Sequence, residues 1–421
     1  MTRRVLRTRA TNPVTDFSVP SPPARLWRTT AVVLSAGCVI AMVGFGIRSV
    51  FGLFLDPMSQ AQGWGRETFA LAMALQNLLW GLGMPVAGAL ADRFGPVRVI
   101  ALGAVVYALG VWGMAEAGSP LALHVFGGIL TGLGVAFTAF SLALAAMARV
   151  VGPERRSFAL GLGTAAGSFG QVVFSPLSQA FIAAYGWHSA LLILATTALA
   201  LIPLAFVLPR GGAHAVSGPA QSLPQALREA VGHRGIVLLT AGFFVCGFQI
   251  AFITVHFPAY VRELGLPAEV GAYAIALVGL FNIVGSFCAG LLGQRFSKRY
   301  GLSAIYFARS LVIIALLAAP AGQVTVYAFS AAMGVLWLST VPLTTGIVAQ
   351  VFGVRYMATL FGVVFFSHQV GSFLGVWLGG WIYDATGSYD PMWWAGVVLG
   401  VAAALVHLPI DERPLARLQP A

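Results

Sequence analysis

Twelve long apolar runs, separated by short polar segments, are the feature of this sequence that most constrains its fold. The hydrocarbon core of a bilayer is about 30 Å thick, and a helix needs about 20 apolar residues to cross it. The pattern therefore predicts an all-α integral membrane protein with about 12 transmembrane helices. We expect these helices near residues 31–55, 67–91, 97–116, 120–147, 156–184, 188–208, 236–261, 268–292, 301–320, 323–350, 356–383 and 391–410.

The composition leaves little chain for a soluble domain. Of the 421 residues, 58% are hydrophobic and 9% are charged, whereas a soluble domain usually has about 25% charged residues. The three cysteines, Cys38, Cys246 and Cys288, lie within apolar runs and lack the spacing of a disulfide framework or a zinc site. No cofactor, metal or enzyme motif is evident, so we expect a protein that is not an enzyme.

The positions of the basic residues predict the topology. Of the 24 Lys and Arg residues, only Arg66 and Arg262 fall on one side of the predicted helices, while Arg48 and Arg309 fall within helices. The others lie on the opposite side, and the positive-inside rule places that side, with both termini, in the cytoplasm. The formal net charge of +11 is thus a topology signal that needs no nucleic-acid partner. We expect a multi-pass protein of the inner (cytoplasmic) membrane.

An internal repeat divides the predicted bundle into two halves. Pro57 and Pro258 are 201 residues apart, as are Gly170 and Gly371. Repeats in the same orientation are typical of transporters, with the substrate site near mid-bilayer between them. The expected organisation is a disordered cytoplasmic N-terminal tail (1–30), a six-helix bundle (31–209), a cytoplasmic linker (210–235) and a second six-helix bundle with a short cytoplasmic tail (236–421).

A motif between the second and third predicted helices carries a family resemblance. The segment Gly88-Ala-Leu-Ala-Asp92-Arg93-Phe-Gly95-Pro-Val-Arg98 is echoed by Gly290-Leu-Leu-Gly-Gln-Arg295 in the second half. It resembles the cytoplasmic loop motif of the major facilitator superfamily.

In that family, the Asp and Arg of the motif latch the helix ends and regulate the conformational switch. The resemblance implies this role for Gly88, Asp92, Arg93, Arg98 and Arg295. A glutamine replaces the acidic residue in the second copy, which predicts a weaker second latch. The alternative is a solvated basic loop that only follows the topology rule.

Arg48 is the most informative polar residue in the predicted membrane segments. An Arg at a helix centre costs about 2.5 to 3.5 kcal/mol on insertion scales, and Gly44 and Gly52 share its helical face. Its guanidinium could hold a carboxylate bidentately, or it could be a buried cation satisfied by carbonyls. The surrounding segment is similar to the first helix of the monocarboxylate transporter subfamily, where a Lys at the matching position takes part in substrate and proton handling. That subfamily's Asp and Arg in helix 8 are absent here, with Asn282 and Ser286 nearby.

Further polar residues within the predicted helices complete a candidate site. Gln249 is the repeat counterpart of Arg48, so we expect the two to face each other across the pseudo-two-fold axis. His256 and His368 are candidates for proton coupling or gating because imidazole titrates near neutral pH. For these histidines and for Arg309, a packing role is the alternative. The other candidate substrate-binding residues are Gln76, Asn77, Gln171, Asn282 and Arg309, with weaker candidates at Thr138, Ser141, Trp337, Ser339, Thr340 and Thr344.

The absence of any deep acidic residue favours an anionic substrate. All 13 Asp and Glu residues fall in tails, in loops or near predicted helix ends, which argues against a pump for cationic drugs. We expect a secondary active transporter that moves small organic anions, with monocarboxylates as the leading class, coupled to protons and working by alternating access. The alternatives are an exporter of hydrophobic or antimicrobial compounds and a non-transporting membrane ligand sensor. The expected partners are the substrate, protons and the lipid bilayer, with no obligate protein partner.

Overall fold

The computed structural model describes residues 29–151, 155–209, 223–353 and 356–415. Nearly all of the expected N-terminal tail and about half of the expected linker lie outside the described residues. Within them the chain forms helices, turns and bends, without a β-strand.

The N-terminal half begins with α1 (Thr30–Ser49), which continues through the short η2 (Phe51–Phe54) into α2 (Leu55–Gln62) as a single crossing. The remaining elements of this half are α3 (Arg66–Phe94), α4 (Pro96–Ala115), α5 (Pro120–Leu123), η3 (His124–Leu130), α6 (Thr131–Phe137), α7 (Phe140–Arg149), α8 (Arg156–Leu199) and α9 (Leu201–Ala205). The segments from α5 to α7 form one crossing.

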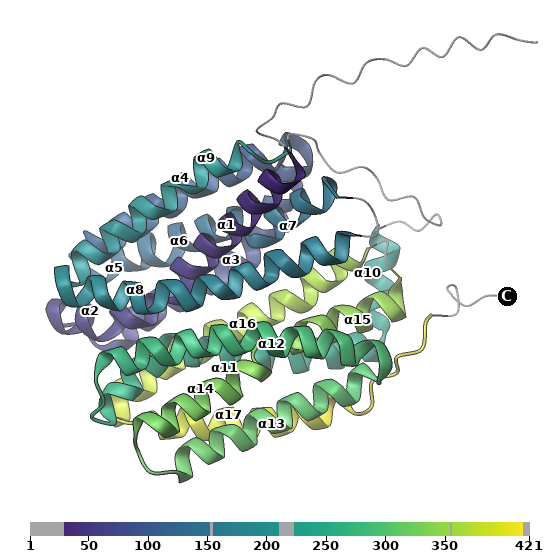
Figure 1. The fold of residues 1–421 in the computed structure, drawn as a ribbon. Helices are drawn as coiled ribbons and strands as arrows, with labels where there is room; N and C mark the ends of the chain where they lie inside the picture. The colour runs from purple at the N-terminus through teal and green to yellow at the C-terminus, as the bar shows by residue number, and fades with distance from the viewer. Residues whose placement is uncertain (1–28, 152–154, 210–222, 354–355, 416–421) are drawn as a thin grey trace, which may run out of the picture.

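The C-terminal half follows a short helix, α10 (Leu223–Gly232), which lies in the expected linker region. The crossings of this half are α11 (Arg234–Glu263), α12 (Ala268–Arg295), α13 (Lys298–Ala318), the pair α14 (Gln323–Leu336) and α15 (Thr340–Phe352), α16 (Met357–Thr386) and α17 (Asp390–His407). Figure 1 shows the two halves side by side, with α8 and α12 adjacent at their boundary.

Eleven helical spans of the described chain are long and apolar enough to cross a membrane. One of them, Phe158–Ala205, is 48 residues long, too long for a single crossing of about 20 residues. It turns at Gly186, where φ is +79° and ψ is 164°, a conformation that only glycine adopts without strain. Two crossings therefore lie on either side of Gly186, which confirms the prediction of about 12 transmembrane helices.

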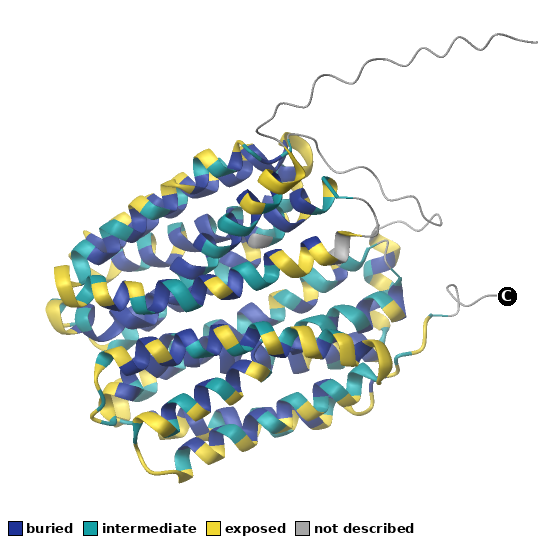
Figure 2. Cartoon of the chain, viewed as in Figure 1, coloured by how far each residue is buried: buried dark blue, intermediate teal, exposed yellow. Residues whose placement is uncertain are grey.

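Each half has its own apolar core. One cluster of buried residues gathers mainly within α1 to α9 and another within α10 to α17. Large apolar side chains are also exposed on the outside of the bundle, among them Trp112, Leu121 and Val324, as Figure 2 shows in yellow along the outer helices. Buried cores combined with an apolar exterior are expected of a protein whose solvent is lipid.

The most extensive contacts between the two halves are made by two antiparallel helix pairs, α3 with α16 and α8 with α12. In the first pair Ala70 lies against Gly380 and Gly81 lies against Gln369. In both pairs the two residue numbers add up to 450, so the same antiparallel register places Gly88 of α3 opposite Gly362 of α16. However, no atom of the other helix lies within 4 Å of a Cβ built on either glycine.

The halves are therefore close at one end of the bundle and separated at the other. We call the end where α1 begins and where α10 lies the terminal end. The opposite end, which holds the α2–α3 and α11–α12 connections, is called the far end. The halves meet at the far end and diverge towards the terminal end.

Candidate functional site

Arg48, near the C-terminal end of α1, lies at the boundary between the two halves. Its Nη2 donates to Oδ1 of Asn77 at 2.5 Å, and the Nδ2 of Asn77 donates to the carbonyl of Met73 at 2.8 Å. The second bond fixes which way the amide points, so its oxygen faces the guanidinium. The Arg48 Cζ also lies 4.3 Å from the ring centroid of Trp80, within the range of a cation–π interaction.

The Arg48 guanidinium retains unused donors. It forms no ion pair with a carboxylate of the described chain, and its buried Nε has no hydrogen-bond partner. A neutral amide and an aromatic face therefore hold this cation. Such an arrangement leaves positive charge and hydrogen-bond capacity for an anionic ligand.

The wall opposite Arg48 comes from α11 of the other half. Ala251, Thr254 and Val255 line the same small cavity as Arg48, Gln76 and Asn77. That cavity has a volume of about 10 Å³, close to the smallest space that holds one water molecule. In this conformation the halves therefore close tightly over the far-end side of Arg48.

Gln249 does not face Arg48, in contrast to the expectation from the repeat. Its Nε2 donates to the carbonyl of Gly396 in α17 at 2.8 Å, and its Oε1 lies 3.4 Å from Nη1 of Arg309. These partners turn its side chain into the C-terminal half. The α11 residues that reach the cavity beside Arg48 are instead Ala251, Thr254 and Val255.

Arg309 is fully buried and bonds to a break in a helix. Between α14 and α15 the chain leaves the helical path, and Nη2 of Arg309 donates to the carbonyls of Leu336 and Trp337 at 2.8 and 2.5 Å. Its Nε adds a bond of 3.3 Å to the carbonyl of Leu336. Carbonyls freed by a helix break within the membrane need a donor, and Arg309 supplies it.

Asn282 connects the same break to the N-terminal half. Its Oδ1 accepts from the backbone N–H of Leu338 at 3.0 Å and from Ser286 at 3.0 Å. Its Nδ2 donates to Ser168 in α8 at 2.9 Å. Gln171, one turn further along α8, is buried against Gly279, and its Oε1 has no partner in the described chain.

The remaining candidates, on α3, α11 and α16, lie in different surroundings. Gln76 donates to the carbonyl of Gly127 at 3.2 Å and lines the cavity beside Arg48. His368 is buried, stacks on Phe365 at 5.5 Å between ring centroids and lies 3.4 Å from Ser372. His256 lies apart from it, near the far end, hydrogen-bonded to Tyr389.

The candidate latch lies at the terminal end, where the halves diverge. Asp92, Arg93, Arg98 and Arg295 are exposed and form no ion pair with a described residue. Gly88 has open space around it. In this conformation these residues are free to pair with other groups.

A cluster of charged residues at the far end was missed by the sequence reasoning. Asp56, Arg66, Arg262, Glu263 and Asp384 come from four different helices and meet between the halves. The sequence did hold a signal that could have predicted this cluster. Arg66 and Arg262 are the only cations predicted on that side, and acidic residues stand at neighbouring helix ends.

The fold and the boundary site define a polytopic membrane protein built from two helical bundles, of the kind that transports solutes. The family model of the Major Facilitator Superfamily matches residues 36–376. The chain therefore belongs to this superfamily of transporters and is not an enzyme.

Individual relatives agree with the family. The chain is 28% identical to monocarboxylate transporter 13 of Bos taurus over 397 residues, with 92% of each chain covered. It is 27% identical to monocarboxylate transporter 11 of Homo sapiens, with 90% of this chain and 83% of the relative covered. Among solved structures, a bacterial homolog of the human lysosomal transporter Spinster, in an inward-facing and occupied conformation, matches with a TM-score of 0.75. The match has 15% identity and covers 94% of this chain and all of the other.

Proposed function

We propose that this protein is a secondary transporter that moves small organic anions, monocarboxylates first among them, coupled to protons and by alternating access. We place it in the cytoplasmic membrane with the terminal end in the cytoplasm, as the distribution of basic residues suggests. The observation that carries the proposal is Arg48, a cation at the boundary of the halves whose partners are neutral.

The geometry at Arg48 suits one carboxylate. The Nε of the guanidinium is unpaired, so a carboxylate could accept along one edge of the planar guanidinium, in the bidentate manner typical of Arg. Asn77 and Gln76 supply amides beside it, and Trp80 supplies an apolar face. The two relatives named monocarboxylate transporters 13 and 11 are in keeping with this chemistry.

Alternating access is supported by the unequal ends of the bundle. The cavity beside Arg48 is closed towards the far end, whereas the α3–α16 pair separates at Gly88 and Gly362. A rocking motion of the halves would widen the space at Arg48 and expose it to either side in turn. Proton coupling would offset the charge of the anion, which otherwise costs about 2.3 kcal/mol per 100 mV of opposing potential.

Uptake into proteoliposomes tests this function. Labelled lactate, pyruvate and acetate are offered with and without an imposed pH gradient, and we expect uptake that the gradient accelerates. Arg48→Gln should abolish it, and Arg48→Lys should weaken it because a point charge replaces the fork. Each charge-assisted hydrogen bond contributes about 1.5 to 3 kcal/mol. Loss of one such bond therefore lowers the affinity for the anion roughly tenfold to 150-fold.

Arg413→Gln is the matched control, because Arg413 is exposed and, among the described residues, forms an ion pair with Asp411 alone. Full uptake by Arg48→Gln would overturn the role of Arg48. A counterflow assay without a pH gradient separates loss of anion binding from loss of proton coupling.

A second function is favoured by the aromatic rings near Arg48. Trp80 packs edge-on against Phe365 at 5.3 Å, and Phe365 continues to Phe361 and His368. An exporter of hydrophobic compounds would use such rings. A change in drug susceptibility on expression, without uptake of organic acids, would favour that function.

A further inference from the structure

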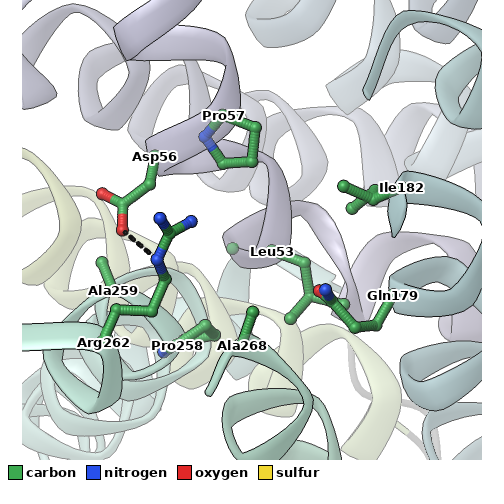
Figure 3. Close-up of a pocket in the computed structure, with 10 residues that line it drawn as sticks. Leu53, Asp56, Pro57, Gln179, Ile182, Pro258, Ala259, Arg262 and Ala268 are labelled. Carbon is green, nitrogen blue, oxygen red and sulfur yellow. Dashed lines mark ion pairs between the residues drawn. The ribbon is translucent and has the colours of Figure 1, made fainter. Parts of the chain in front are cut away.

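The far end of the bundle is closed by charged residues that bridge the two halves. Arg66 at the start of α3 pairs with Asp56 of α2 at 2.9 Å and with Glu263 of α11 across the boundary. Arg262 of α11 approaches the same carboxylate of Asp56 at 3.7 Å, and Figure 3 shows this ion pair beside the far-end cavity. Asp56 is 6% exposed, so solvent screens these interactions less than those of a surface pair.

A second bridge uses the start of α3 itself. Asp384 of α16 accepts hydrogen bonds from the backbone N–H groups of Arg66 and Glu67, at 2.9 and 2.8 Å. The first N–H groups of a helix have no partner within it and attract negative charge. A residue of one half therefore caps a helix of the other, and Trp377 adds a bond of 3.0 Å to Glu67.

A buried histidine is connected to this cluster through a tyrosine. His256 is fully buried, with Nε2 at 2.8 Å from the carbonyl of Val376 and Nδ1 at 2.9 Å from the hydroxyl of Tyr389. The same hydroxyl accepts from Nη1 of Arg66 at 3.1 Å. One oxygen atom thus joins the imidazole of the C-terminal half to the guanidinium of the N-terminal half.

The direction of these hydrogen bonds follows from their partners. A carbonyl only accepts, so Nε2 of His256 carries a hydrogen, and in the neutral ring Nδ1 is then an acceptor. Tyr389 donates to Nδ1 and accepts from Arg66. In this series of three hydrogen bonds every donor points in the same direction, from Arg66 through Tyr389 and His256 to the carbonyl of Val376.

We propose that the cluster of Asp56, Arg66, Arg262, Glu263 and Asp384 is the far-end gate, and that a proton on His256 opens it through Tyr389. The inference rests on the proposed transport function and assigns a regulatory step to it. A proton added at Nδ1 makes this nitrogen a donor, so the Tyr389 hydroxyl must turn its own hydrogen elsewhere. The imidazolium and the guanidinium then share one oxygen, and their repulsion weakens the contact that holds Arg66.

Among the described residues, no carboxylate contacts His256 to offset this charge. His256 meets Tyr389, the residue before α17, the carbonyl of Val376 in α16 and, in its own helix, the ring of Phe252. Arg66 of α3 lies beyond Tyr389. The carboxylates of Asp56, Glu263 and Asp384 bind to the Arg66 side of the cluster instead.

Labelling of a cysteine beneath the gate tests the inference. Gln179 of α8 is 8% exposed and lines the far-end cavity next to Asp56 and Arg262. The variant Gln179→Cys is made in a chain whose Cys38, Cys246 and Cys288 are replaced by Ala, and is reacted with a bulky maleimide in nanodiscs. Its rate is divided by that of Tyr185→Cys, an exposed position of the same helix, which cancels the pH dependence of the thiol.

We expect this ratio to rise several-fold between about pH 7.5 and about pH 5.5, because opening of the gate exposes the His256 imidazole to solvent, where imidazole takes up a proton in this range. His256→Gln should remove the rise, because an amide can donate to Val376 and accept from Tyr389 but takes up no proton. Tyr389→Phe should raise the labelling ratio at every pH and should also reduce its dependence on pH. His188→Gln is the matched control, since His188 lies at the same end and pairs with Glu116 outside the cluster.

A labelling ratio that does not change with pH when the gate residues are intact would overturn the inference. An unchanged pH dependence of that ratio in His256→Gln would overturn it as well. Should His256→Gln not fold, Tyr389→Phe gives the same decision. Anion uptake by the same proteins is measured in parallel. Uptake that persists while the labelling stays independent of pH refutes this gate alone, whereas absence of uptake refutes the proposed function.

Discussion

The side-chain amide of Asn282 in α12 donates to the hydroxyl of Ser168 in α8 at 2.9 Å, so the two halves share a buried polar contact near the middle of the bundle. The carbonyl of the same amide accepts from the backbone N–H of Leu338 at the break between α14 and α15. One side chain therefore joins both halves to a discontinuous helix. This point is suited to act as a pivot while the two ends of the bundle open and close.

A double-mutant cycle with Asn282→Ala and Ser168→Ala should reveal this coupling. Interhelical hydrogen bonds in membrane proteins contribute about 0.6 kcal/mol on average and up to about 2 kcal/mol. We expect the two substitutions to be non-additive by that amount in the free energy of unfolding, measured by detergent titration. Strict additivity would show that the contact does not form in the membrane.

The approach of α11 to Gly52 predicts that Gly52→Ala keeps the far end from closing. A Cβ at this position would overlap with the backbone carbonyl of Thr254, and overpacking of this kind costs about 1 to 3 kcal/mol. Spin labels at Glu116→Cys and Glu269→Cys report the distance between the halves at that end. We expect a longer mean distance in Gly52→Ala and no change in Gly161→Ala, where a Cβ meets open space.

Arg309→Met separates a structural from a substrate role. The substitution leaves the carbonyls of Leu336 and Trp337 without their donor, and each buried unsatisfied group costs about 1 to 3 kcal/mol. We expect a lower melting temperature of the purified protein without any ligand, with partial recovery in Arg309→Lys. An unchanged melting temperature together with lost anion binding would instead assign Arg309 to the substrate.

Asp92→Asn should impair transport without destabilising this conformation. Asp92 is exposed and forms no ion pair with the described residues, so the free energy of unfolding should change by less than about 0.5 kcal/mol. If Asp92 forms the latch when the terminal end closes, the rate of anion exchange should fall several-fold. Asp411→Asn, an exposed carboxylate at the same end, is the control. Equal exchange rates in the two variants would argue against the latch.

Much of the fold could be predicted because the bilayer imposes a simple rule on the sequence. Every crossing needs an apolar run of sufficient length, and the expected helices agree with the observed ones to within about three residues, except that the first crossing continues to Gln62 rather than ending near residue 55. Even the turn at Gly186 falls between the expected helices 156–184 and 188–208. Arg48, Asn77 and Gln76, each selected from the sequence, line one small cavity, and their part in substrate binding stays a prediction.

The error at Gln249 shows what a repeat offset does not specify. The offset gives the depth of a residue along its helix, but a shift of one residue rotates a side chain by roughly 100° about the helix axis. Packing against α13 and α17 turned Gln249 towards Gly396 and Arg309. Neither the hydropathy pattern nor the repeat offset predicts how far α11 is rotated about its own axis.

The sequence by itself determined the membrane class, the number of crossings, the two halves and the presence of a cation, Arg48, within a crossing, because these depend on transfer of residues from water to lipid. Only the tertiary structure decided that Arg309 and Asn282 satisfy a broken helix, and that Arg66, Glu263, Tyr389 and His256 meet at the far end. Those contacts join helices far apart in the chain. Their geometry depends on how each helix is rotated and tilted against its neighbours, which no local property of the sequence fixes.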